Sequence, residues 1–312
     1  MDARRVADRL GIPFYVWDFS ERFRDDVIDD FLSEYQAGRT PNPCMRCNEK
    51  IKFAALLERA IELGFDAVCT GHYAILRDGA EGLELHRSSE EAKDQSYVLG
   101  VLNAEQLAHA YFPLGETPSK ALVREEAAER GFTVASKPDS YDICFIPDGD
   151  TRGYLAEKVG ATPGVILDRS GEVVGSHDGA HAFTVGQRRG LRLGVPAPDG
   201  KPRFVLEVRP ISNEVVVGPK EALAIAEIAG GRFSWAGAAP ALHDWLDCEV
   251  QIRAHADPVP ARAILSDGEV VVRPDTPLDG VAPGQTAVLY LGTRVLGQFT
   301  IDRTVSAVPA VV

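Results

Sequence analysis

The sequence predicts an α/β unit followed by all-β units, and three observations support this prediction. Up to about residue 148, apolar residues at helical spacing alternate with short apolar runs. From about residue 150, β-like runs separated by turn residues replace that pattern. A stretch of small residues over 219–231 then divides the β-rich part. Because 312 residues are long for one core, we expect domains over 1–148, 149–220 and 221–312, the second β-rich and the third a β-barrel.

The first part is predicted to contain five helices and several strands. Amphipathic spacing predicts the helices, the third of them capped by Asn48, over 2–10, 21–35, about 49–63, 103–110 and 119–130. Apolar runs predict a buried strand over 12–17 and a second strand over 66–73, and a hairpin is predicted over 76–86. Alternating helices and apolar strands are typical of a parallel sheet covered on both faces.

The second part is predicted to be built from short strands. Seven runs rich in β-branched and apolar residues lie at 164–167, 204–208, 214–217, 248–253, 261–265, 269–273 and 287–291. Strands at such spacing are typical of β-barrels and sandwiches.

Charge is unevenly distributed along the chain. The 33 Lys and Arg against 46 Asp and Glu give a net charge of -13, which opposes indiscriminate binding to nucleic acid or anionic membranes. Two basic islands, over 36–53 and 181–220, nevertheless indicate a specific polyanion site. We find neither a long apolar run nor a hydrophobic segment behind the N-terminal charges, so we expect no membrane association and a cytoplasmic location.

The most unusual stretch is a proline-punctuated turn over 40–53 that carries Cys44 and Cys47 at C-x-x-C spacing. We expect both cysteines on a stiff loop, with Cys47 just before a helix start, where backbone N–H groups favour a thiolate. Three interpretations remain open from the residues alone: a zinc site, a redox pair, or two cysteines of no special chemistry. Five scattered cysteines do not suggest a disulfide framework.

Three further segments are candidates for function. Gly71 and His72 follow an apolar strand, where α/β folds place ligands. Arg188 and Arg189 lie on a glycine-bounded loop suited to phosphate, although a solvated basic turn is the plain alternative. Cys144 follows a polar loop, which makes it a candidate despite the usual packing role of a lone cysteine.

Together these segments resemble the tRNA-specific 2-thiouridylase family over nearly the whole chain. The matching motifs occur in the family's order, at Gly38–Asn48, Ile51–Phe53, Thr70–Ala74, Lys93–Tyr97, Phe112–Gly115, Lys137–Ser140, Ile143–Ile146, Thr184–Arg188 and Pro283–Gln285. The resemblance implies a Rossmann-like ATP-pyrophosphatase domain of the adenine nucleotide alpha hydrolase type, followed by a β-rich tRNA-binding domain and a β-barrel. It also implies a sulfurtransferase that replaces the C2 oxygen of the wobble uridine with sulfur.

The resemblance assigns roles residue by residue. Cys144 matches the position that receives a persulfide, and Cys47 matches the nucleophile, with a transient disulfide between them after sulfur delivery. Gly71 matches an ATP contact, and Mg²⁺ is expected with the ATP. Positions that match contacts to the tRNA or its target base are Asn42, Pro43, Cys44, His72, Lys93, Asp94, Gln95, Arg188, Arg253 and Gln285. A sulfur carrier or a cysteine desulfurase relay protein is the implied donor.

The sequence departs from the family pattern in three ways. The opening strand and the Ser-Gly-Gly-x-Asp-Ser loop that binds ATP do not occur, as expected of a truncated gene model or a fragment. Cys44 stands where some members carry an aspartate, and Ala254 stands where an aromatic residue is usual. The alternative function is therefore a tRNA-binding or persulfide-handling protein that cannot adenylate its substrate.

Overall fold

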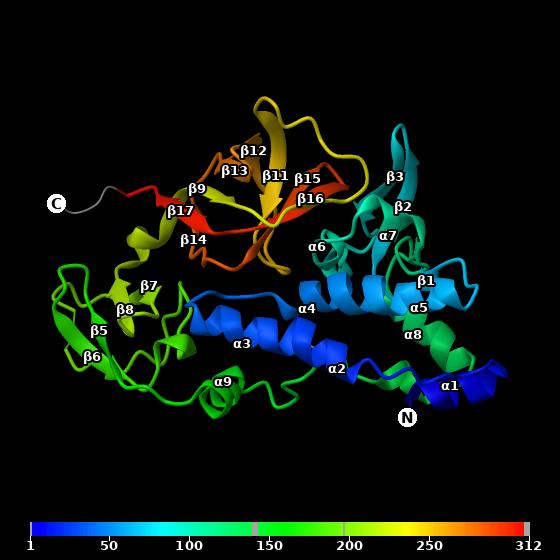
Figure 1. Cartoon of the computed structure of the whole chain (residues 1–312), viewed down its shortest axis with the longest axis horizontal. Helices are drawn as coiled ribbons and strands as arrows, with labels where there is room; N and C mark the ends of the chain where they lie inside the picture. Colours follow the sequence, from blue (N-terminus) through cyan, green and yellow to red (C-terminus); the bar gives the residue numbers. More distant parts are fainter. Residues whose placement is uncertain (1, 139–142, 196, 309–312) are drawn as a thin grey trace.

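The computed structural model describes residues 2–138, 143–195 and 197–308. The motif residues Asp139 and Ser140 lie outside these ranges. Figure 1 shows two long helical segments that cross the molecule, with barrel strands on one side, a small β unit near one end and a β-hairpin near the other.

The predicted helices are confirmed, with one shift in bounds. The first two helical segments are α1 (Asp2–Leu10) and the run of α2 (Ser20–Phe23), π-helical η1 (Arg24–Ile28) and α3 (Asp29–Gln36). The helices predicted over 103–110 and 119–130 are α7 (Ala104–Ala108) and α8 (Lys120–Glu129). The remaining short helices are η3 (Glu91–Lys93), α6 (Ser96–Leu99), η4 (Thr133–Ser136), α9 (Thr151–Val159), η5 (Ala180–Ala182) and η6 (Lys220–Leu223).

The shifted helix is the one that follows the proline turn. It consists of α4 (Pro43–Arg46), π-helical η2 (Cys47–Ala55) and α5 (Leu56–Glu62), with a kink at Phe53. The prediction that Asn48 caps this helix was wrong. Asn42 is the N-cap, its side-chain oxygen accepts a hydrogen bond from the Met45 N–H, and Pro43 occupies the first helical position, where its missing N–H costs nothing.

The predicted strand over 12–17 does not form. Its apolar side chains are exposed, among them Tyr15 at 69% and Val16 at 75%. A strand needs a neighbour for its backbone groups, and no described strand lies beside this segment. The parallel sheet in this part consists of two short strands, β1 (Val68–Cys69) and β4 (Ala110–Tyr111).

The predicted hairpin forms, but it belongs to a larger sheet. Its strands are β2 (Ala74–Gly79) and β3 (Gly82–Arg87), and β3 pairs with β16 (Arg294–Thr300) near the other end of the chain. Leu85 lies opposite Val295, and both side chains are fully buried. The first part and the C-terminal strands therefore share one sheet and one core.

The central β unit has four strands in the order β6-β5-β8-β7. Three were predicted and are confirmed: β5 (Gly164–Leu167), β7 (Phe204–Arg209) and β8 (Glu214–Gly218). The fourth, β6 (Val173–His177), was not predicted.

The C-terminal strands form a barrel. Strands β9, β13, β12, β11, β15 and β16 pair in that order, and the Thr300 N–H donates to the Gly231 carbonyl at 3.0 Å to join the last strand to the first. The strands not yet given bounds are β9 (Ala224–Gly230), β10 (Ser234–Trp235), β11 (Leu246–Gln251), β12 (Val259–Ser266), β13 (Glu269–Pro274), β14 (Leu278–Asp279), β15 (Thr286–Leu291) and β17 (Arg303–Ser306).

Candidate functional site

The helix α4–η2 presents two faces to two different cavities. Residues at positions 43, 44, 47, 48 and 52 line one cavity, and residues at positions 42, 45, 46, 49 and 50 line the other. Side chains three or four positions apart share a helix face, so this division follows directly from the helical geometry. The cysteine pair and the charged residues beside it are thereby separated.

The first cavity, which we call the thiol pocket, has a volume of about 330 Å³. Its lining residues are Phe23, Val27, Pro43, Cys44, Cys47, Asn48, Lys52, His72, Gln95, Val98, Ile143, Cys144 and Phe145. The pocket brings Cys47 together with Cys144, which the resemblance had predicted to work as a pair. Cys44 and Cys144 are exposed, and Cys47 is half-buried.

The prediction that the helix start favours a Cys47 thiolate was wrong. The helix begins four residues earlier, at Pro43, so Cys47 lies inside it and Cys44 lies in its first turn rather than on a loop. Burial raises the pKa of the Cys47 thiol, and negative charge on Cys144 or Cys44 raises it further. Lys52 is the group that acts in the opposite direction.

His72 is buried in the wall of the pocket at 8% exposure. Its Nδ1 lies 2.7 Å from the Thr70 hydroxyl oxygen, and its Nε2 lies 3.4 Å from the Lys52 ammonium nitrogen. Burial, followed by the charge of Lys52, lowers the pKa of His72 to about 4. The imidazole is therefore neutral at neutral pH.

Two of the other residues predicted to contact tRNA, Gln95 and Asp94, are held by hydrogen bonds to neighbouring residues. Gln95 bridges to Tyr73: its side-chain oxygen accepts from the Tyr73 N–H at 3.1 Å, and its own N–H donates to the Tyr73 carbonyl at 2.8 Å. Asp94 accepts hydrogen bonds from the N–H groups of Ser88 and Ser96, at 2.8 and 3.3 Å, and from the Ser96 hydroxyl. Only Gln95 of this pair lines the pocket.

The structure places the remaining predicted residues outside the thiol pocket. Lys93 ends η3, and Gly71 is exposed, with only Leu114 near the position that a Cβ would take, at 3.8 Å. Arg188 is exposed, Arg253 donates to the carbonyls of Asp279 and Gly280, and the Gln285 side chain accepts from the Ala282 N–H.

Sequence reasoning did not predict a site role for two polar residues of the pocket, Asn48 and Lys52. The Asn48 side-chain nitrogen donates to the Val98 carbonyl at 2.9 Å, which fixes the amide orientation. Its side-chain oxygen is buried without a partner in the described part of the chain. Lys52 lines the pocket in the structure. The sequence does not predict this position, because a lysine within a basic island gives no sign of where its side chain lies.

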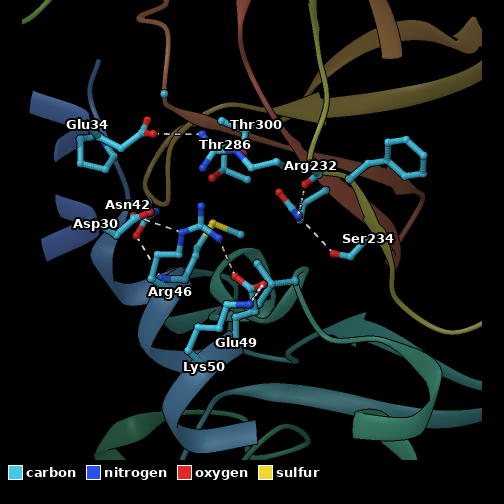
Figure 2. Close-up of a pocket in the computed structure, with 16 residues that line it drawn as sticks. Asp30, Glu34, Asn42, Arg46, Glu49, Lys50, Arg232, Ser234, Thr286 and Thr300 are labelled. Carbon is cyan, nitrogen blue, oxygen red and sulfur yellow. Dashed lines mark hydrogen bonds and ion pairs between the residues drawn. The ribbon is translucent and has the colours of Figure 1, made fainter. Parts of the chain in front are cut away.

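The second cavity, the polar cleft, has a volume of about 360 Å³ and separates the helices from the barrel. Figure 2 shows Asp30 and Glu34 of α3 and Arg46 of α4 facing Arg232 and Thr286 on the barrel side. The charged groups of this cleft are already paired with one another, so we assign the chemistry to the thiol pocket.

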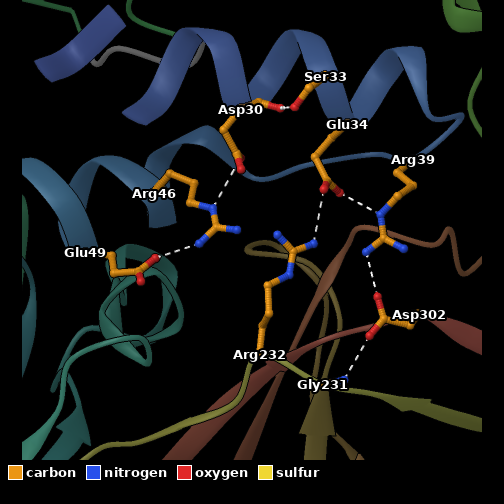
Figure 3. Close-up of polar contacts among 9 residues, drawn as sticks. All are labelled: Asp30, Ser33, Glu34, Arg39, Arg46, Glu49, Gly231, Arg232 and Asp302. Atoms are coloured by element: carbon orange, nitrogen blue, oxygen red, sulfur yellow. Dashed lines mark hydrogen bonds and ion pairs between the residues drawn. The ribbon is translucent and has the colours of Figure 1, made fainter. Parts of the chain in front are cut away.

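An ion-pair network crosses from the helices to the barrel, as Figure 3 shows. Glu34 accepts from Arg39 at 2.7 Å and from Arg232 at 3.1 Å, and Arg39 also contacts Asp302 at 2.8 Å. On the helix side, Arg46 pairs with Asp30 and Glu49 at 3.2 and 2.9 Å. These ion pairs join the helix that carries Cys44 and Cys47 to α3, and α3 to the barrel.

Over residues 2–138, 143–195 and 197–308, no group of three or more His, Cys, Asp or Glu side chains is arranged to hold a metal ion. The helices in the described ranges also include none with the length and apolar character needed to cross a bilayer.

Comparison with known proteins identifies the family. Three family models match in succession: a tRNA methyl transferase HUP domain over 1–148, a tRNA methyl transferase PRC-barrel domain over 152–219, and an aminomethyltransferase beta-barrel domain over 225–301.

Close relatives carry one name. The tRNA-specific 2-thiouridylase MnmA of Leifsonia xyli subsp. xyli is 74% identical over 99% of this chain and 85% of the relative. The proteins of the same name from Clavibacter sepedonicus and Micrococcus luteus are 72% and 66% identical, over 99% and 96% of this chain and 79% and 82% of the relatives. The chain therefore belongs to the tRNA-specific 2-thiouridylase family.

Proposed function

We propose that this chain is a tRNA-uridine 2-sulfurtransferase that thiolates the wobble uridine through a cysteine persulfide. The observation that carries the proposal is the thiol pocket, where Cys47 and Cys144 from distant segments line one cavity. A volume of about 330 Å³ lies within the usual range of small-molecule sites. The names of the close relatives support the same reaction.

The descriptions of two matching family models mention methyl transfer rather than thiolation. The pocket favours sulfur chemistry, because three of its lining residues are cysteines and two of them match the family's working pair. A persulfide carrier needs one thiol to receive sulfur and a second thiol to complete its release, and this pocket supplies both.

The sulfur steps use Cys144 first and Cys47 second. Cys144 accepts a sulfur atom from a donor and becomes a persulfide. The terminal sulfur bonds to C2 of the uracil as the activated oxygen leaves, so that a disulfide links Cys144 to the base. The Cys47 thiolate attacks the Cys144 sulfur, and the electron pair of the broken S–S bond forms the C=S group. The Cys47–Cys144 disulfide that remains is reduced by an external thiol.

Binding of the tRNA is assigned to residues around and beyond the pocket. Asn42, Pro43 and Cys44 lie at the start of α4, where they would hold the target base. Pro43 and Cys44 line the thiol pocket, and Asn42 lines the polar cleft. Arg188 is exposed, which suits a phosphate contact. Lys93, Asp94, Gln95, His72, Arg253 and Gln285 complete the proposed tRNA contacts.

ATP with Mg²⁺ is the cofactor that the resemblance implies, and Gly71 is the position of this chain that matches an ATP contact. The leaving group on the uridine comes, in the resemblance, from ATP. We therefore assign to the residues of this chain only the sulfur steps, with a sulfur carrier or a desulfurase relay as donor, and expect a reducing compartment such as the cytoplasm.

The experiment tests sulfur loading and thiolation separately. The chain is incubated with cysteine and a cysteine desulfurase, and the Cys144 peptide is weighed by mass spectrometry. We expect the mass of one added sulfur atom on Cys144. Addition of ATP, Mg²⁺ and unmodified tRNA then tests for 2-thiouridine by nucleoside chromatography.

The control variant is Cys144→Ser, which should abolish thiolation while leaving tRNA affinity nearly unchanged. Thiolation that persists in Cys144→Ser contradicts the persulfide assignment. Sulfur loading without any thiolation by the unsubstituted chain supports the alternative, a persulfide-handling protein that cannot use ATP.

A further inference from the structure

Lys52 and Cys47 line the same cavity although they lie five positions apart on the helix. Lys52 is four positions after Asn48, and side chains four positions apart share a helix face. Asn48 directly follows Cys47 and also lines the cavity. The helix is kinked at Phe53, immediately after Lys52.

His72 holds the Lys52 side chain in the pocket. An ammonium group only donates hydrogen bonds, so at 3.4 Å from Lys52 the Nε2 of His72 is the acceptor. The neutral ring then carries its proton on Nδ1, which donates to the Thr70 hydroxyl at 2.7 Å. The low pKa of His72, about 4, keeps the imidazole in this accepting form at neutral pH.

Lys52 is the only cationic side chain among the described residues that line the pocket. The titratable groups that share the cavity with it are His72 and the three thiols Cys44, Cys47 and Cys144. Much of the remaining wall is apolar, with Phe23, Val27, Val98, Ile143 and Phe145. An apolar wall strengthens the interaction between charges, so a single cation here has a large effect on any thiolate.

We propose that Lys52, positioned by His72, stabilises the thiolate of Cys47 and so prepares this residue for sulfur transfer. The inference rests on the proposed function, because it concerns the step in which Cys47 attacks the Cys144 sulfur. That step needs the thiolate, which burial alone disfavours. Lys52 also opposes the effects of burial and of Cys144 at Cys44, so its influence covers both thiols of the C-x-x-C pair.

The test measures the reactivity of Cys47 in the absence of tRNA and ATP. The unsubstituted chain and the variants Lys52→Met, Lys52→Gln and Lys52→Arg are treated with iodoacetamide at a series of pH values. Trypsin separates the thiols, because Cys44 lies in peptide 40–46, Cys47 in 47–50 and Cys69 in 60–77. Cys69 is exposed and does not line the pocket, so it is an internal control in every sample.

We expect both neutral variants to slow Cys47 alkylation roughly fivefold near neutral pH and to move its pH profile to higher pH. Lys52→Arg, which keeps the charge, should retain most of the rate, and Cys69 should react equally in all samples. Parent-like Cys47 profiles in the two neutral variants overturn the proposal. So does a loss in Lys52→Arg as large as that in Lys52→Met, because the charge would then not matter.

This test is independent of the test of the proposed function. If Cys144→Ser retained thiolation, the sulfur steps would be wrong, yet the effect of Lys52 on Cys47 would still be measurable. If the alkylation profiles did not change, Lys52 would have no such role, and the persulfide assignment would be unaffected.

Discussion

Replacing Glu34 with glutamine should weaken the attachment of helix α3 to the barrel. Glu34 accepts from Arg39 at 2.7 Å and from Arg232 at 3.1 Å, and its side chain is 15% exposed. Exposed ion pairs contribute about 0.2–1 kcal/mol each, whereas removing one partner of a buried pair costs about 3–5 kcal/mol. Because the arginines are 20% and 44% exposed, we expect a loss of about 2 kcal/mol in the free energy of unfolding, between these limits.

Urea unfolding at pH 7 measures this loss, with Glu58→Gln as the matched control. Glu58 pairs with Arg22 at 3.2 Å, but the two side chains are 65% and 47% exposed, so we expect a loss of at most about 0.5 kcal/mol. A double-mutant cycle with Arg232→Gln should give a coupling energy of about 1 kcal/mol, because this pair joins α3 to the barrel.

The effect of Glu34 should also depend on pH. Burial alone would raise the pKa of Glu34, but the ion pairs with Arg39 and Arg232 hold it below its ordinary value. A carboxylate with a lowered pKa contributes stability above its unfolded-state pKa, and that contribution is lost as the pH falls through the folded-state value. The difference between Glu34→Gln and the unsubstituted chain should therefore shrink in acid. The reasoning is refuted if Glu34→Gln is no more destabilising at pH 7 than Glu58→Gln.

Three further predictions concern the pocket and the basic loop. The lowered pKa of His72, about 4, means that stability should fall between about pH 6.5 and 4, by up to about 3 kcal/mol, and His72→Gln should reduce this slope in urea titrations across that range. Asn48→Asp, which cannot donate to the Val98 carbonyl, should cost about 1–3 kcal/mol of unfolding free energy, and unchanged stability would show that this hydrogen bond is unimportant. Arg188→Ala with Arg189→Ala should weaken tRNA binding and lower the slope of log affinity against log salt by about two, whereas an unchanged slope would make the loop a solvated turn.

Local sequence signals predicted much of the secondary structure. Strand β5 was predicted at its observed bounds, 164–167, because β-branched residues lie there between turn residues. Strand β9 was missed, since its small residues resemble a linker, and β16 was missed because Gly297 interrupts its pattern. The segment 12–17 has strand composition, but composition cannot supply the neighbouring strand that pairing requires.

The site was predicted less completely, for reasons that particular residues make clear. The pairing of Cys47 with Cys144 came from the family resemblance, since nothing local connects two thiols so far apart. The sequence does contain a signal for the helix start, because Asn42 is a favourable N-cap and Pro43 a favourable first helical residue. The prediction missed it because the prolines at 41 and 43 were interpreted as a rigid loop. Lys52 was not predicted, because a lysine within a basic island carries no local signal that its side chain lines a pocket.

The pairing of β3 with β16 has a consequence for how the protein is made. Leu85 can pair with Val295 only after about 210 more residues have been synthesised. At typical rates of translation this takes roughly 10 to 40 s. Until then, the hairpin beside the thiol pocket has an unpaired edge and an incomplete core. Such an edge invites pairing with other chains, so a nascent chain is most exposed to aggregation during that interval and most dependent on chaperones. Mutations in β16 should therefore lower the yield of folded protein through an element that lies far from the pocket in sequence.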